Sequence, residues 1–191
     1  MPRIVAMLPG RTLIGAGPAL ILVLALATGV PAQTAQTFIA ELAPAGPTAA
    51  GAAPSGRITL RLNAADETLS YELRLAGIER VVGSHFHSVR WRTTADGARI
   101  AVDPAEGEGP IVAFFLRFKS GGVPGDGVVS TGTIAKAELI GDFSRRPFAD
   151  LIEHLEKGYL YATVHSLETR NGGVYCCPVA LRGFFRSAGG S

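Results

Sequence analysis

The feature that most constrains this chain is a pair of neighbouring segments in which apolar and polar residues alternate one by one. Residues 57–63 read RITLRLN and residues 69–75 read LSYELRL, with a turn-forming stretch at 64–67 between them. Because successive side chains point to opposite faces of a β-strand, each segment gathers its apolar residues on one face. The pattern predicts an antiparallel hairpin with one face in the core and the other in water.

Most of the remaining chain also reads as short strands. Extended segments recur at 37–42, 81–91, 111–118, 131–140, 159–167 and 174–185, and turns or Gly- and Pro-rich loops lie between many of them. One segment, residues 147–157, has a helical period, with Pro147 in its first turn and Gly158 after its end. We therefore predict an all-β fold: an antiparallel sandwich of Greek-key, immunoglobulin-like or superoxide-dismutase-like type, with one short helix.

The first 32 residues read as a secretory signal peptide. Arg3 and Arg11 form a short basic region, residues 12–28 carry no charge, and small residues at Val30 and Ala32 suit cleavage before Gln33. The alternative is an uncleaved anchor, but the apolar run of about 17 residues is at the lower limit for a membrane span. We predict a secreted or periplasmic protein with a single folded domain over residues 33–191 and no membrane span after cleavage.

Charge and motif content exclude several classes of function. The chain has 18 Lys and Arg against 16 Asp and Glu, and loss of Arg3 and Arg11 with the signal leaves 16 of each. Nucleic-acid affinity rests largely on neutralising phosphates, so a neutral chain without a basic run is not expected to bind nucleic acid. The sequence also lacks the G-x-S-x-G, H-E-x-x-H and P-loop motifs. We therefore expect no enzymatic activity.

Three of the four histidines form a candidate metal site. His85 and His87 lie two residues apart in an extended segment, so their rings share one face while Phe86 lies on the other. His165 closes a later strand that a sandwich places beside the first. Three imidazoles around one point suit a single Cu or Zn ion. The alternative is that these histidines hydrogen-bond loop backbone at strand ends, and His154 is expected on the solvated side of the helix.

Cys176 and Cys177 are adjacent and are the only two cysteines. Their Cα atoms would be about 3.8 Å apart across a trans peptide, whereas a relaxed disulfide needs about 5.5–6 Å, and on a strand their side chains point to opposite faces. Three states remain open: a strained vicinal disulfide, free or intermolecularly paired thiols, or one cysteine as a fourth metal ligand. The sequence favours free or intermolecularly paired thiols, because strain makes a vicinal bridge easy to reduce.

The order of these features resembles that of the CHRD domain, which is found in chordin and in many exported bacterial proteins. The resemblance spans roughly residues 37–185, and its most specific parts are the H-x-H at 85–87 and the tract GYLYATVHS at 158–166. Two places differ: Val89 stands where the family motif H-I-H-x-G has Gly, and residues 172–177 (GGVYCC) replace the family's G-E-I-R-G, with LRG only at 181–183. The resemblance implies an extracytoplasmic β-sandwich with no established catalytic activity.

The sequence therefore predicts an exported CHRD-domain protein that acts as a non-catalytic binding or interaction module. Its partner, a protein or a surface, is not identified, and a Cu or Zn site at His85, His87 and His165 is a hypothesis. The alternative is a Cu/Zn-binding redox metalloprotein of superoxide-dismutase-like architecture, which needs a coordination position open to a small oxidant. Metal analysis of protein from its native compartment would separate these two classes of function.

Overall fold

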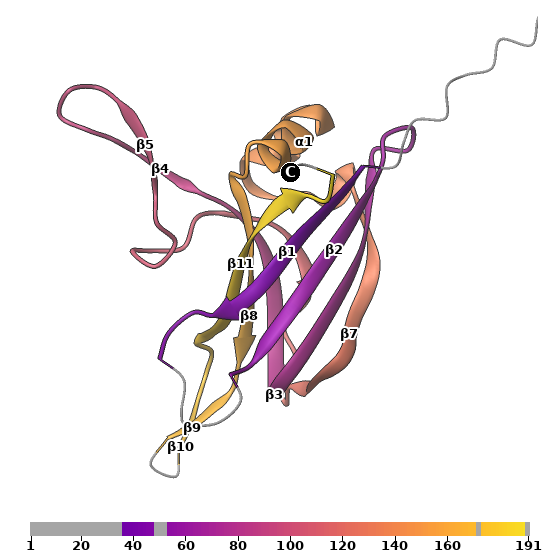
Figure 1. The fold of residues 1–191 in the computed structure, drawn as a ribbon, viewed down its shortest axis with the longest axis vertical. Coiled ribbons are helices and arrows are strands. Elements are labelled where there is room, and N and C mark those ends of the chain that lie inside the picture. The colour runs from indigo at the N-terminus through magenta and orange to yellow at the C-terminus, as the bar shows by residue number, and fades with distance from the viewer. Residues whose placement is uncertain (1–35, 48–52, 171–172, 190–191) are drawn as a thin grey trace, which may run out of the picture. The chain divides into compact units, whose positions relative to one another are not determined.

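The structure is a computed structural model that describes residues 36–47, 53–170 and 173–189. The predicted signal peptide at 1–32 and the predicted domain start at Gln33 lie outside these residues. The described elements, in chain order (Figure 1), are β1 (Thr37–Pro44), β2 (Ser55–Asn63), β3 (Thr68–Ser88), β4 (Arg90–Thr93), β5 (Arg99–Val102), β6 (Ile111–Leu116), β7 (Val123–Ala135), the 3₁₀ turns η1 (Lys136–Glu138) and η2 (Gly141–Arg145), α1 (Phe148–Glu156), β8 (Leu160–Ser166), β9 (Glu168–Arg170), β10 (Gly173–Tyr175) and β11 (Val179–Ser187).

The two alternating segments form the predicted hairpin. β2 pairs antiparallel with the first half of β3, and Ile58 lies opposite Leu73 while Leu62 lies opposite Leu69. Ile58, Leu69 and Leu73 are fully buried. Burying a side chain of this size contributes about 1.5–3 kcal/mol, so the apolar face of the hairpin is a major part of the core.

The main sheet closes on itself through β3. Its strand order is β2-β1-β11-β8-β3-β6, with β7 also paired to β3 and β2 paired to β3 as well. β3 is 21 residues long: its first half pairs with β2, while its second half pairs with β8 and β6. The all-β class, the antiparallel pairing and the single α-helix of the described residues are confirmed. The sheet is barrel-like, however, and does not separate into the two sheets of the predicted sandwich.

Three segment predictions need correction. Residues 81–88 continue β3 and are not a strand of their own. Residues 123–127, predicted as a loop, already belong to β7 because they pair with the bent middle of β3. Residues 136–138, predicted as strand, form the 3₁₀ turn η1. In each case long-range pairing along the long β3 decides where a strand begins or ends.

The helix α1 lies at one end of the strands (Figure 1). It runs from Phe148 to Glu156, close to its predicted bounds, and Gly158 follows it with a positive φ of 69°. Leu151 and Leu155 are fully buried and join the same apolar cluster as the strands. Within the part of the chain that the structure describes, no helix is both long and apolar enough to span a membrane.

Candidate functional site

Strand pairing brings the three predicted histidines onto one face of the sheet. β3 and β8 are antiparallel neighbours in which Gly83 lies opposite His165 and His85 lies opposite Thr163. Residues opposite one another share a face, so His85, His87 and His165 lie on the same side, and Phe86 on the other side is buried in the core. The ring centres of His85 and His87 are 5.6 Å apart, and those of His85 and His165 are 4.8 Å apart. We call these three side chains the histidine cluster.

Two rings of the histidine cluster are held by backbone carbonyls. Nδ1 of His87 lies 2.8 Å from the Gly109 carbonyl oxygen, and Nδ1 of His165 lies 2.8 Å from that of Cys177. A carbonyl only accepts, so each Nδ1 carries a proton and donates it. In the neutral ring the proton is then absent from Nε2, which keeps a lone pair.

Both of these Nε2 atoms face a single hydroxyl. Thr163 Oγ1 is 3.1 Å from His87 Nε2 and 3.3 Å from His165 Nε2. A hydroxyl has one proton to donate. It satisfies one of the two imidazole lone pairs and leaves the other without a proton, so the cluster has more acceptors than donors.

His85 adds a further nitrogen without a partner. Its Nδ1 is buried and makes no hydrogen bond, and its ring packs edge-on against Phe114 at 5.2 Å. Burial, reinforced by repulsion from His165 and His87, lowers the pKa of His85 to about 4. Burial also lowers the pKa of His87, although its hydrogen bond to Gly109 opposes that shift. His85 and His87 are therefore neutral at pH 7, the form in which imidazole binds metals.

The histidine cluster reaches solvent at one edge. Nε2 of His165 lies 4.0 Å from a carboxylate oxygen of Glu108, and the two side chains are 12% and 35% exposed. Among the described residues, no set of three or more His, Cys, Asp or Glu side chains is arranged so that it could hold a metal ion as it stands. The three rings thus form a cluster with unpaired nitrogens, and a metal site at these residues stays a prediction.

The two cysteines are joined in a vicinal disulfide, so the interpretation as free or intermolecularly paired thiols is wrong for this structure. That interpretation rested on the ease with which a strained vicinal bridge is reduced, and on a strand geometry in which adjacent side chains point apart. Cys176 and Cys177 instead lie between β10 and β11, outside both strands. Neither sulfur is a free thiolate, and Cys177 meets the histidine cluster through its carbonyl oxygen.

The prediction that His154 lies on the solvated side of the helix is wrong. Its Nδ1 donates to the carbonyl of Asp150, one helical turn back, at 2.7 Å. Its half-buried ring packs edge-on against Phe143 at 5.1 Å and Tyr159 at 6.0 Å. Both aromatic residues come from outside the helix, so the helical period alone does not reveal these contacts.

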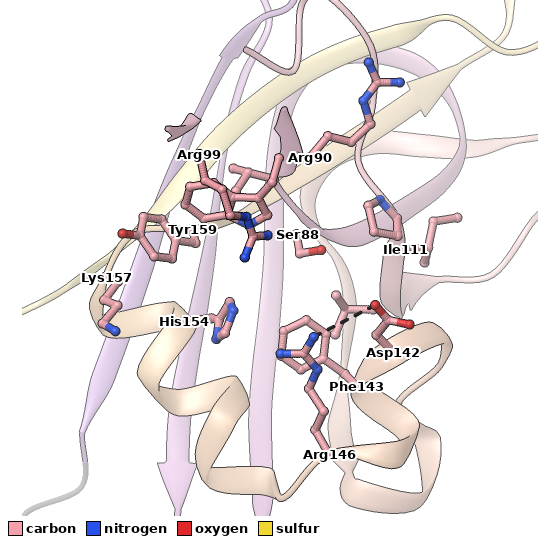
Figure 2. Close-up of a pocket in the computed structure, with 14 residues that line it drawn as sticks. Ser88, Arg90, Arg99, Ile111, Asp142, Phe143, Arg146, His154, Lys157 and Tyr159 are labelled. Carbon is pink, nitrogen blue, oxygen red and sulfur yellow. Dashed lines mark ion pairs between the residues drawn. The ribbon is translucent and has the colours of Figure 1, made fainter. Parts of the chain in front are cut away.

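His154 lines a hollow of about 540 Å³ beside the end of β3 (Figure 2). The β4–β5 hairpin, the start of β6, the turn η2 and α1 surround it, together with Tyr159 directly before β8. Arg99, Arg146 and Lys157 are among its lining residues, and we call it the cationic pocket. The sequence gives no signal of this pocket, because its basic residues are separated along the chain and form no basic run.

The described residues thus form a barrel-like all-β domain that carries the histidine cluster on one strand pair and the cationic pocket beside the end of β3. Residues 38–174 match the CHRD domain family, and the chain belongs to that family. The match contains all three histidines of the cluster and ends at residue 174, within the tract 172–177 that departs from the family pattern. No curated protein and no solved structure matches the chain.

Proposed function

We propose that this CHRD-domain protein is an exported, non-catalytic binding module that holds one Cu or Zn ion at His85, His87 and His165. The observation that carries the proposal is the buried Nδ1 of His85, which has no hydrogen-bond partner. Buried polar atoms are nearly always paired. A cation bound by this nitrogen and by the two Nε2 atoms would satisfy lone pairs that one hydroxyl proton cannot.

The surroundings of the rings support a metal ion over a purely structural cluster. Metal-binding histidines usually donate their second ring nitrogen to a carbonyl or carboxylate, which fixes the ring and its tautomer. His87 and His165 both do so. Rings bound to one ion at about 2.0–2.1 Å have centres roughly 5 Å apart, and the two measured separations are 4.8 and 5.6 Å.

Binding requires the three nitrogens to move onto one centre. We expect side-chain rotation to provide this movement, because β3 and β8 are both interior strands of the closed sheet with partners on each side. Since both cysteines are in a disulfide, the fourth ligand would be water or the nearby carboxylate of Glu108. Imidazole and carboxylate ligands suit Zn and Cu(II).

Metal titration of the metal-free protein tests the proposal. We expect one Cu or Zn ion per chain in wild type, and affinity lower by roughly 10–100-fold or more in His85→Gln and His165→Gln. Glu106→Gln, in the same loop as Glu108 but paired with Arg92, is the matched control and should bind like wild type. Circular dichroism establishes that each variant is folded. Equal affinity in wild type and both histidine variants would leave the cluster as hydrogen-bonding residues only.

Export is the second part of the proposal. The first 32 residues support it by their signal-peptide pattern. The vicinal disulfide agrees, because disulfides persist mainly in oxidising, extracytoplasmic compartments. Mass spectrometry of the purified protein should find its N-terminus at or within a few residues of Gln33, and a soluble cytosolic form that retains Met1 would contradict export.

A redox metalloprotein is the alternative function, and the exposed edge of His165 is the observation that favours it. A small oxidant needs such access to the ion. Copper-loaded wild type, compared with copper-loaded His165→Gln, separates the two. Our proposal expects copper binding without catalysed superoxide loss. Turnover that disappears in the variant would establish the redox function instead.

A further inference from the structure

The cationic pocket has a continuous aromatic wall. Trp91 packs edge-on against Tyr159 with ring centres 4.9 Å apart, Tyr159 meets His154 at 6.0 Å, and His154 meets Phe143 at 5.1 Å. Trp91 comes from β4, His154 from α1 and Phe143 from η2, and Tyr159 directly precedes β8. Trp91 remains 38% exposed. Large aromatic surface left open beside a hollow is typical of a ligand site.

An arginine lies over each end of this wall. The guanidinium carbon of Arg99 is 5.3 Å from the Trp91 ring centre, and that of Arg146 is 5.5 Å from the Phe143 ring centre. Stacking on an aromatic face holds the planar guanidinium in place, so less side-chain entropy is lost when it binds an anion. In Figure 2 these two groups lie on the hollow, whereas Arg90 carries its guanidinium away from it.

The acidic side chains nearby do not neutralise these cations fully. Asp142 is the one carboxylate among the described residues that line the pocket, and it lies 4.0 Å from Arg146. Lys157 pairs with Glu153 one helical turn back. For Arg99, no ion pair is found in the described part of the chain. Arg99 is therefore a stacked, uncompensated cation at the mouth of the hollow.

We propose that the cationic pocket binds a small ligand in which an anionic group is attached to a ring. The anion, a phosphate, sulfate or carboxylate, would lie on Arg99 and Arg146, and the ring would lie against the aromatic wall. The volume of about 540 Å³ suits such a ligand, since small-molecule pockets span about 300–1,000 Å³. This site is separate from the histidine cluster and does not rest on the metal proposal.

Calorimetry with simple probes tests the proposal on the whole protein. Phenyl phosphate carries both features, inorganic phosphate carries the anion alone, and benzyl alcohol carries the ring alone. We expect phenyl phosphate to bind more tightly than either of the others, and its affinity to fall as salt rises. Adenosine monophosphate and glucuronate then distinguish a nucleotide from an acidic sugar as the source of the anion and ring.

Variants separate the two parts of the site. Arg99→Gln should weaken phenyl phosphate binding roughly tenfold or more, the loss expected for a charged hydrogen bond. Trp91→Ala should weaken phenyl phosphate binding more than inorganic phosphate binding, because it removes the ring contact as well as the surface on which Arg99 stacks. Arg92→Gln is the control and should bind like wild type, because Arg92 lies beside Trp91 on β4 but does not line the pocket.

Equal phenyl phosphate affinity in wild type, Arg99→Gln and Trp91→Ala would overturn the proposal. So would the absence of binding of every probe to wild type at about 10 mM, a concentration at which even a weak site is occupied. Measuring metal affinity in the same Arg99→Gln preparation keeps the two sites distinguishable. Unchanged metal affinity with lost anion binding supports two independent sites. Loss of both would show that Arg99→Gln disturbs the fold, and Trp91→Ala then decides.

Discussion

The histidine cluster and the cationic pocket lie near one another but are built in opposite ways. The cluster lies on two paired interior strands, and backbone carbonyls hold two of its rings. The pocket is assembled from the β4–β5 hairpin, the start of β6, the turn η2, α1 and the residue before β8, and its basic groups reach solvent. Residues 109–110 connect them, because the Gly109 carbonyl accepts from His87 and Pro110 lines the pocket.

The two proposed ligands differ in charge because the two regions differ in burial. In the cluster, burial keeps His85 and His87 neutral, so their nitrogens have lone pairs to give to a cation. In the pocket, guanidinium groups at the surface keep their charge and attract an anion. A region of neutral buried bases and a region of exposed permanent cations therefore call for ligands of opposite charge.

The largest effect is expected where the two regions meet. A Cβ on Gly109 would lie 1.7 Å from the carbonyl oxygen of Ser88, which is backbone and cannot move aside alone. Gly109→Ala should lower the free energy of unfolding by about 3 kcal/mol or more and weaken metal and phenyl phosphate binding together. Gly121→Ala, with open space around its Cβ, is the control and should stay within about 0.5 kcal/mol of wild type.

Urea denaturation and the two binding titrations measure this outcome. Loss at one site alone in Gly109→Ala would mean that the segment does not support both regions.

A smaller effect is expected when one ring of each region is removed. His87→Ala loses hydrogen bonds to Gly109 and Thr163 and the stacking of its ring on Tyr161 at 5.1 Å. We expect a loss of about 3 kcal/mol, because the groups left behind are buried. His154→Ala loses one hydrogen bond on a half-buried helix face and should cost about 1 kcal/mol. Equal losses in urea denaturation would contradict the contrast in burial.

The stability contributed by the histidine cluster should also depend on pH. The folded-state pKa of His85, about 4, lies below its ordinary value of 6.5. The unfolded chain therefore takes up this proton more readily, so the associated stability is fully present above about pH 6.5 and is lost as pH falls towards 4. In metal-free protein, unfolding free energy should decline less steeply from pH 7 to 5 in His85→Gln than in wild type. Identical slopes would show that His85 is not a buried neutral base.

The smallest effect is expected for the stability contribution of the pocket's arginine. Arg99 stacks on a partly exposed Trp91 and has no ion pair within the described residues. An exposed cation–π contact contributes about 0.5–1 kcal/mol, so Arg99→Ala should shift the urea midpoint only slightly. A loss above about 2 kcal/mol would show that Arg99 also holds the hairpin in place.

Much of the fold follows from the sequence because the signals are local. The alternation at 57–63 and 69–75 predicts a strand pair with one buried face, and the period at 147–157 predicts the helix; both are confirmed. The two-residue spacing of His85 and His87 places both rings on one face by strand geometry alone. The H-x-H and the GYLYATVHS tract also carry the family resemblance, and the chain belongs to that family.

Tertiary structure decided what depends on distant partners. Closure of the sheet follows from β3 pairing with β2 in one half and with β8 in the other, which no local period encodes. The carbonyls that hold His87 and His165 come from loops 22 and 12 residues away, and they determine which nitrogens keep lone pairs. The cationic pocket joins residues as far apart as Trp91 and Tyr159. Both sites depend on the register of paired strands and on where the loops run, and packing of the whole chain decides these. The spacing of apolar residues in a strand or helix, in contrast, is fixed by the backbone geometry of that segment alone.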